Sequence, residues 1–208
     1  MKHRKILFVV FAGTFFVTSM STFLWAAEEP GKFLIKTIDR GLSVLKEPSL
    51  KGTEKAQERR QRLWEEISPV FNFEEMSKRS LGVHWKKRTP EEKKEFVELF
   101  TNILKDNYIG QTDTYSGEKI VFLKERHDDD NHATVQTKII TNTGTEVLVD
   151  YRMLNNDGEW RIYDMVIEGI SFVNNYRSQF NNTLMKSSFE ELIQKMKEKM
   201  GKEETSTN

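Results

Sequence analysis

The chain has 208 residues, of which 37% are hydrophobic and 31% charged, so one domain with a soluble exterior and a modest core is expected. Its 32 basic and 32 acidic residues balance, and this neutrality gives no attraction to the phosphate backbone of a nucleic acid. The chain has no cysteine, which excludes disulfides, thiol nucleophiles and thiolate metal sites.

The N-terminus has the layout of an export signal. A short basic segment precedes an apolar run over residues 6–25, and two alanines follow before the chain turns polar. This pattern predicts a signal peptide over residues 1–27, cleaved after Ala26 or Ala27. An uncleaved anchor is the alternative, because the apolar run approaches membrane-spanning length. In both cases the folded part is expected outside the cytoplasm.

A helical period follows, from about residue 30 to residue 110. The first stripe is formed by Phe33, Leu34, Ile38, Leu42 and Leu45. A highly charged segment over residues 54–67 then carries Leu63, Trp64 and Ile67 near its end. Both segments are therefore expected to be amphipathic, with one apolar face each.

Two further helices have recognisable starts. Asn72 is the expected N-cap of a short helix. Thr89 begins a capping box with Glu92, and Pro90 occupies the first helical position. The second of these helices has an apolar stripe and is expected to stop at Gly110; the stripe is formed by Phe96, Leu99, Phe100, Ile103 and Leu104.

From residue 116 the apolar period changes to two, which predicts strands at 119–126, 133–141, 146–154 and 160–168. The short links are rich in Asp, Asn and Gly and favour an antiparallel meander. The third strand has an apolar face that needs a cover, formed by Val147, Val149, Tyr151 and Met153.

Two helical stripes after the sheet complete the pattern. They are formed by Ile170, Val173, Tyr176 and Phe180, and by Leu192, Ile193 and Met196. Residues 201–208 are polar and are expected to be a disordered tail. The predicted fold class is α+β, a curved antiparallel sheet of about four strands packed against several helices.

Signals for catalysis or metal binding are weak. His127 and His132 flank an Asp run that lacks the glycine and terminal glutamate of a calcium loop, so a solvated turn is favoured over a metal site. Asp164 and Glu168 are predicted on one face of the last strand, together with Trp160, Ile162 and Val166. They offer either an acid–base pair or hydrogen-bond acceptors at a strand end, and the second reading is favoured. Neither a phosphate-binding glycine loop nor a nucleophile elbow is found in the sequence.

Three segments carry a family resemblance. Residues 160–180 read WRIYDMVIEGISFVNNYRSQF, which resembles the C-terminal signature of the MlaC, or toluene-tolerance, family of periplasmic phospholipid-binding proteins. The family's helical block is similar to FNFEEMSKRSLGVHWKKRTPEEKKEFVELFTNIL at residues 71–104, and the start of its sheet to residues 115–119. The resemblance covers roughly residues 30–199 in matching order.

The resemblance implies a single lipid-binding domain over residues 28–200. Its sheet would be of the nuclear-transport-factor-like or cystatin-like kind, with a hydrophobic cavity that holds phospholipid as cargo rather than as a cofactor. The family's carriers exchange lipid with the MCE-domain subunit of an inner-membrane ABC transporter and with an outer-membrane lipoprotein–porin complex, which maintains outer-membrane lipid asymmetry. A hopanoid-linked branch with similar motifs leaves another apolar lipid as an alternative cargo. Neither a metal nor catalysis is implied.

The residues expected to contact lipid come from the capped helix, the third strand and the signature block. They are Phe96, Phe100, Ile103, Val147, Val149, Tyr151, Trp160, Tyr163, Val166, Ile170, Tyr176 and Phe180. Head groups would lie in water at the cavity mouth, so low head-group selectivity is expected. Two other functions remain open: an envelope enzyme on the same scaffold that uses Asp164 and Glu168, and an envelope protein that binds only other proteins.

Overall fold

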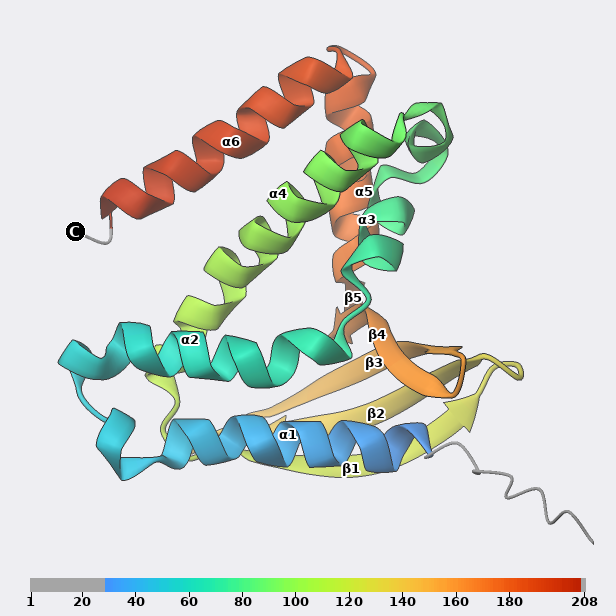
Figure 1. Cartoon of the computed structure of the whole chain (residues 1–208). Coiled ribbons are helices and arrows are strands. Elements are labelled where there is room, and N and C mark those ends of the chain that lie inside the picture. Colours follow the sequence, from blue (N-terminus) through green and yellow to red (C-terminus); the bar gives the residue numbers. More distant parts are fainter. Residues whose placement is uncertain (1–28, 207–208) are drawn as a thin grey trace, which may run out of the picture.

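The helices precede and follow a single antiparallel sheet. The computed structural model describes residues 29–206 (Figure 1). Its helices are α1 (Pro30–Lys46), α2 (Ala56–Ile67), α3 (Phe73–Leu81), α4 (Pro90–Ile109), α5 (Phe172–Leu184) and α6 (Phe189–Ser206). Its strands are β1 (Lys119–His127), β2 (His132–Ile140), β3 (Glu146–Asn156), β4 (Glu159–Ile167) and β5 (Ile170–Ser171). Short 3-10 turns link the first four helices and follow α4; they are η1 (Pro48–Leu50), η2 (Thr53–Lys55), η3 (Ser68–Val70), η4 (Gly82–Lys87) and η5 (Gly110–Thr114).

The predicted helix starts are confirmed. The Thr89 hydroxyl accepts a hydrogen bond from the Glu92 amide at 3.2 Å, and the Glu92 carboxylate accepts one from the Thr89 amide at 2.7 Å. The Asn72 side chain accepts from the Glu75 amide at 2.9 Å. Helix α4 ends before Gly110 as predicted, but Gly110 does not adopt the left-handed conformation of a typical glycine cap. Its φ is −60°, and the chain continues into the 3-10 turn η5.

The sheet has five strands in the order β1-β2-β3-β4-β5, rather than about four. The additional strand arises because Glu168 and Gly169 both have positive φ, 49° and 79°, and turn the chain back on β4. Ile170 and Ser171 then pair with Ile167 and Val166. Ile170 therefore lies in β5 and not on the following helix, and its side chain is 64% exposed.

A β-bulge in β4 changes which side chains face the helices. Arg152 of β3 pairs with Asp164, but the next residue, Met153, pairs with Ile162, so Tyr163 is the extra residue. The sequence-based prediction that Asp164 shares a face with Ile162 is therefore wrong. After the bulge the alternation is reversed, and it is Met165 that lies on the same side as Ile162.

The apolar interior is divided into two clusters. In Figure 1, α1 and α2 lie across one face of the sheet, while α3 to α6 rise away from it. The helical cluster is built around aromatic rings of α4 and α5, with Phe96 edge-on to Phe180 at 5.3 Å and Phe100 edge-on to Tyr176 at 4.9 Å. The sheet cluster packs Leu34 of α1 against Val135 and Met153.

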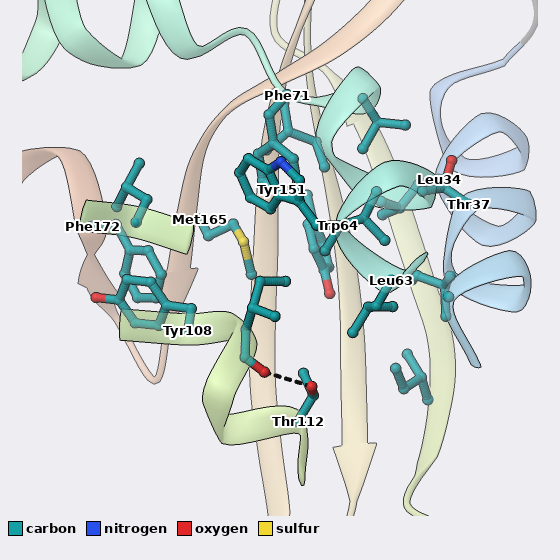
Figure 2. A pocket seen from close by; sticks show the side chains of 18 of the residues that line it. Leu34, Thr37, Leu63, Trp64, Phe71, Tyr108, Thr112, Tyr151, Met165 and Phe172 are labelled. Atoms are coloured by element: carbon teal, nitrogen blue, oxygen red, sulfur yellow. Dashed lines mark hydrogen bonds between the residues drawn. The ribbon is translucent and has the colours of Figure 1, made fainter. Parts of the chain in front are cut away.

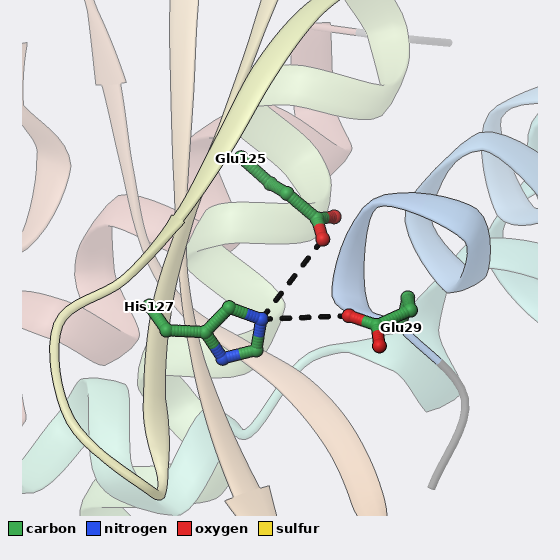
Figure 3. A group of neighbouring side chains, drawn as sticks. All are labelled: Glu29, Glu125 and His127. Atoms are coloured by element: carbon green, nitrogen blue, oxygen red, sulfur yellow. Dashed lines mark ion pairs between the residues drawn. The ribbon is translucent and has the colours of Figure 1, made fainter.

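The N-terminus of α1 is fixed to the edge strand β1. The Gly31 amide donates to the Glu125 carboxylate at 2.8 Å, and His127 Nε2 lies 3.5 Å from Glu29 and 3.9 Å from Glu125 (Figure 3). A Cβ at position 31 would lie 2.9 Å from the Phe122 ring and closer still to the Glu125 carboxylate, so these side chains would have to shift to admit any other residue. The oxygen and nitrogen atoms of the three ionisable side chains lie within 4.8 Å of one another. Ion pairing and capping of the helix account for this arrangement.

The other hairpin histidine has a different partner. His132 Nδ1 lies 2.9 Å from the Asp129 carboxylate, so the two histidines do not converge on a shared site.

Two predictions concern the ends of the chain. The signal peptide, its cleavage at Ala26 or Ala27, and the alternative anchor lie outside the described residues. At the other end, α6 runs to Ser206, through most of the segment that the sequence assigns to a disordered tail. Within residues 29–206, no helix combines the length and apolarity that crossing a bilayer requires.

Candidate functional site

An apolar cavity of about 340 Å³ lies between α1, α2, the end of α4 and the sheet (Figure 2). Its volume lies within the range of roughly 300–1,000 Å³ that is typical of ligand pockets. The helices contribute Leu34, Ile38, Leu42, Leu45, Leu63, Trp64, Ile67, Met76, Leu104, Tyr108, Ile109 and Phe172. Phe73, the first residue of α3, belongs to the same wall. The sheet and the connecting segments contribute Val70, Phe71, Ile120, Tyr151, Ile162, Met165 and Ile167. Two threonines, Thr37 and Thr112, and one glycine, Gly41, complete the wall.

The two threonine hydroxyls of the wall are satisfied locally. Thr37 donates its hydroxyl hydrogen to the Phe33 carbonyl at 3.1 Å, and Thr112 donates to the Ile109 carbonyl at 2.6 Å. Because these bonds stay within their own turns of chain, neither hydroxyl requires a partner on a ligand.

The wall is also electrically neutral. Burial raises the pKa of Tyr108 to about 12, with a smaller contribution from Tyr176, and burial also raises the pKa of Tyr151. Both phenols are therefore uncharged at physiological pH. None of the described residues that line the cavity has a charged side chain. Such a wall suits hydrocarbon.

A charged cross-link lies beside the end of the cavity that contains Thr112. Asp113 of η5 accepts hydrogen bonds from Arg59 at 2.9 Å and from Arg60 Nε at 2.9 Å, and Arg59 also donates to the Leu50 carbonyl at 2.7 Å. Desolvation by itself would raise the pKa of Asp113, but the hydrogen bonds and charges of Arg60 and Arg59 outweigh it and hold this pKa below its ordinary value. The cross-link joins η1, α2 and η5.

Asp113→Asn is expected to lower the free energy of unfolding by about 1–2 kcal/mol at pH 7, since charged hydrogen bonds are lost. Because the folded-state pKa is depressed, the stabilisation is complete above the unfolded pKa of about 3.9 and is lost as the pH falls through the folded value. Urea unfolding of both proteins at several pH values should therefore show a difference that shrinks below about pH 4. A difference that stays constant with pH would contradict this account.

The residues that the sequence predicts to contact lipid are dispersed. Tyr151 lines the cavity. Val147, Val149 and Trp160 pack in the sheet cluster, and Val166 is buried with 6% exposure. Tyr163 lies beneath the Arg79 guanidinium at 4.1 Å and Ile170 is exposed. The helical cluster takes up the others, Phe96, Phe100, Ile103, Tyr176 and Phe180.

These residues are dispersed because most of α4 packs against other helices and not against the cavity. The first turns of its stripe pack against α5 and α6, and only the last turns, with Leu104, Tyr108 and Ile109, reach the cavity. The main wall instead comes from α1 and α2. Their stripes are visible in the sequence, but a stripe does not reveal whether its partner is another side chain or a hollow.

Asp164 and Glu168 do not form a pair. Asp164 is 2% exposed and accepts hydrogen bonds from Arg152 at 3.0 Å, from the Ser171 hydroxyl at 2.6 Å and from the Val173 amide at 3.0 Å. Glu168 lies in the turn after β4 and accepts a hydrogen bond from the Leu148 amide. Neither residue lines the cavity. Their roles here are those of hydrogen-bond acceptors, as the favoured reading of the sequence has it.

Comparison with known proteins identifies the family. A family model described as MlaC protein matches residues 35–198, which is most of the chain. The chain belongs to the MlaC family. The resemblance stated from the sequence is thereby confirmed.

Two curated relatives share moderate identity with this MlaC-family chain. The intermembrane phospholipid transport system binding protein MlaC of Haemophilus influenzae is 28% identical over 137 residues, which is 64% of both chains. Toluene tolerance protein ttg2D of Pseudomonas putida is 28% identical over 122 residues, 58% of this chain and 57% of its own. The matches thus span less than two thirds of either relative.

A solved structure has the same fold. The phospholipid-binding protein of Ralstonia solanacearum, determined in complex with a phospholipid, superimposes with a TM-score of 0.74 and 23% identity. The match covers 83% of this chain and 97% of that one.

Proposed function

We propose that this protein is a phospholipid-binding carrier whose cavity encloses acyl chain. The observation that carries the proposal is the neutral wall of the cavity, in which the polar groups Thr37 and Thr112 are satisfied by their own backbone. The phospholipid named with the Ralstonia protein, and the transport named for the Haemophilus relative, support the same assignment.

The energetics of transfer explain why such a cavity is needed. Withdrawing a methylene from a bilayer into water costs about 0.8 kcal/mol, so a sixteen-carbon tail costs roughly 10 kcal/mol or more. A protein wall of Leu, Ile, Phe and Trp replaces the bilayer contacts and removes most of that penalty.

The finer proposal concerns place and partners. The protein would act in the periplasm after export, receiving or delivering phospholipid at the MCE-domain subunit of an inner-membrane ABC transporter and at an outer-membrane lipoprotein–porin complex. It would do so without catalysis. The family match and the predicted export signal support this assignment.

Phospholipid is expected to copurify with the protein. Organic extraction followed by mass spectrometry should recover phospholipid in near-stoichiometric amount from protein purified without detergent. A chain that carries no phospholipid, and takes none up from vesicles, would contradict the proposal and favour a protein that binds only other proteins. Recovery of a hopanoid in its place would favour the alternative cargo.

A further inference from the structure

A polar cleft adjoins the apolar cavity. One side is formed by Phe71, Asn72 and Phe73, between α2 and α3. The other side is the β3–β4 hairpin, with Asn156, Asp157, Glu159 and Arg161. Phe71 and Phe73 also line the apolar cavity, so the two spaces share a wall.

The shared wall consists of stacked rings. The Phe71 and Phe73 rings stack with centroids 5.6 Å apart, and Phe73 lies 5.5 Å from Trp64. The backbone beneath the rings is fixed, because the Asn72 amide donates to the Ile162 carbonyl at 2.8 Å and Phe71 forms a bridge with Ile162.

This end of the cavity contrasts with the end near Thr112. There, Asp113 holds Arg59 and Arg60 in a charged cross-link that joins three elements. At the Phe71 end, the side chains between the two spaces are aromatic rings. Two phenylalanine rings thus lie between the apolar cavity and the polar cleft, where the cross-linked end has charged groups.

The cleft carries charge of both signs. Arg161 donates to Glu159 at 2.6 Å and to the Trp160 carbonyl at 3.2 Å. Asp157 projects from the exposed hairpin turn two residues before Glu159. A ligand with a phosphate and an ammonium group matches this pattern, with its anion at Arg161 and its cation at the two carboxylates.

We propose that the cleft seats the head of the bound lipid and favours a zwitterionic aminophospholipid over an anionic one. The inference rests on the proposed function, since the tails of the same molecule fill the cavity. The stacked Phe71 and Phe73 rings are then the point at which the chain passes from the polar cleft to the apolar cavity. Such selectivity would differ from the low head-group selectivity expected from the sequence.

A competition experiment tests this assignment. Delipidated protein is incubated with vesicles of equal phosphatidylethanolamine and phosphatidylglycerol content, reisolated, and its lipid quantified by class. The wild-type protein should hold the zwitterionic lipid in about fivefold excess, the scale of a partly exposed ion pair. The double variant Asp157→Asn with Glu159→Gln should reduce the ratio to about one, because the partners for the ammonium are removed. Total lipid per protein is quantified in the same samples, so that a change in the class ratio is distinguished from a change in loading.

The control is Arg126→Gln, which removes an exposed cation of β1 that pairs with Asp128 and lies outside the cleft. It should retain the wild-type ratio. Equal loading of the two classes by the wild-type protein, or a double variant with an unchanged ratio, overturns the cleft assignment while the measured total lipid leaves the carrier function intact. Absence of any bound lipid in the wild-type protein would overturn both.

Discussion

Met165→Asp is expected to remove nearly all bound phospholipid from the purified protein. Met165 follows the bulge in β4 and lines the cavity, where no described wall residue has a cationic side chain to pair with a new carboxylate. An unpaired charge in such surroundings costs several kcal/mol, and about 3 kcal/mol already weakens binding roughly a hundredfold. Phospholipid per protein, measured by mass spectrometry, should fall below about a tenth of the wild-type value on that scale.

Val121→Asp is the matched control. Val121 of β1 is 39% exposed and does not line the cavity, so the same charge is introduced in water on the same sheet. This variant should keep its lipid. If a folded Met165→Asp protein, verified by circular dichroism, retained lipid at the wild-type level, the assignment of this cavity to acyl chain would be refuted.

Asp164→Ala is expected to be the most destabilising substitution of a polar residue discussed here, at about 3 kcal/mol. The Ser171 hydroxyl and the Val173 amide would lose their acceptor where water does not reach them. The Arg152 pair contributes less, because the Arg152 side chain is 41% exposed and its charge is screened. Urea unfolding should show the loss, and the melting temperature should fall by roughly 5–12 °C.

Asp130→Ala is the matched control, because it deletes an aspartate carboxylate that is exposed to solvent in the β1–β2 turn. It should change the free energy of unfolding by less than about 0.5 kcal/mol. A stable Asp164→Ala protein would reopen the reading of this residue as a catalytic acid. Lipid content of the folded fraction of Asp164→Ala should match the wild type, since Asp164 lies outside the cavity wall.

Local signals in the sequence predict most of the elements. The capping residues Thr89 and Asn72 determine where α4 and α3 begin, and both caps depend on neighbours within three residues along the chain. The four long strands follow from alternation and turn residues, within about two residues of their observed bounds. Strand β5 has only two residues, so it shows no alternation of apolar and polar side chains from which it could be predicted.

The lining of the cavity is harder to predict from the sequence than the helices and strands are. A period-two pattern assumes unbroken alternation, so the extra residue Tyr163 moves Met165 to the cavity side without leaving a signal. Likewise, Phe96 and Met76 look equally apolar, but the first packs against rings and the second borders the hollow. Whether an apolar face meets protein or empty space depends on contacts between distant segments.

Under the proposed function, the position of the cavity determines where the protein without lipid is least well packed. Bound lipid would supply packing atoms beneath α1 and α2, whereas the rings around Phe96 and Phe100 pack against one another. Unloading therefore takes dispersion contacts from the cover of the sheet and leaves the helical arm intact. Release of lipid would therefore loosen the cover of the sheet more than the ring contacts of α4 with α5.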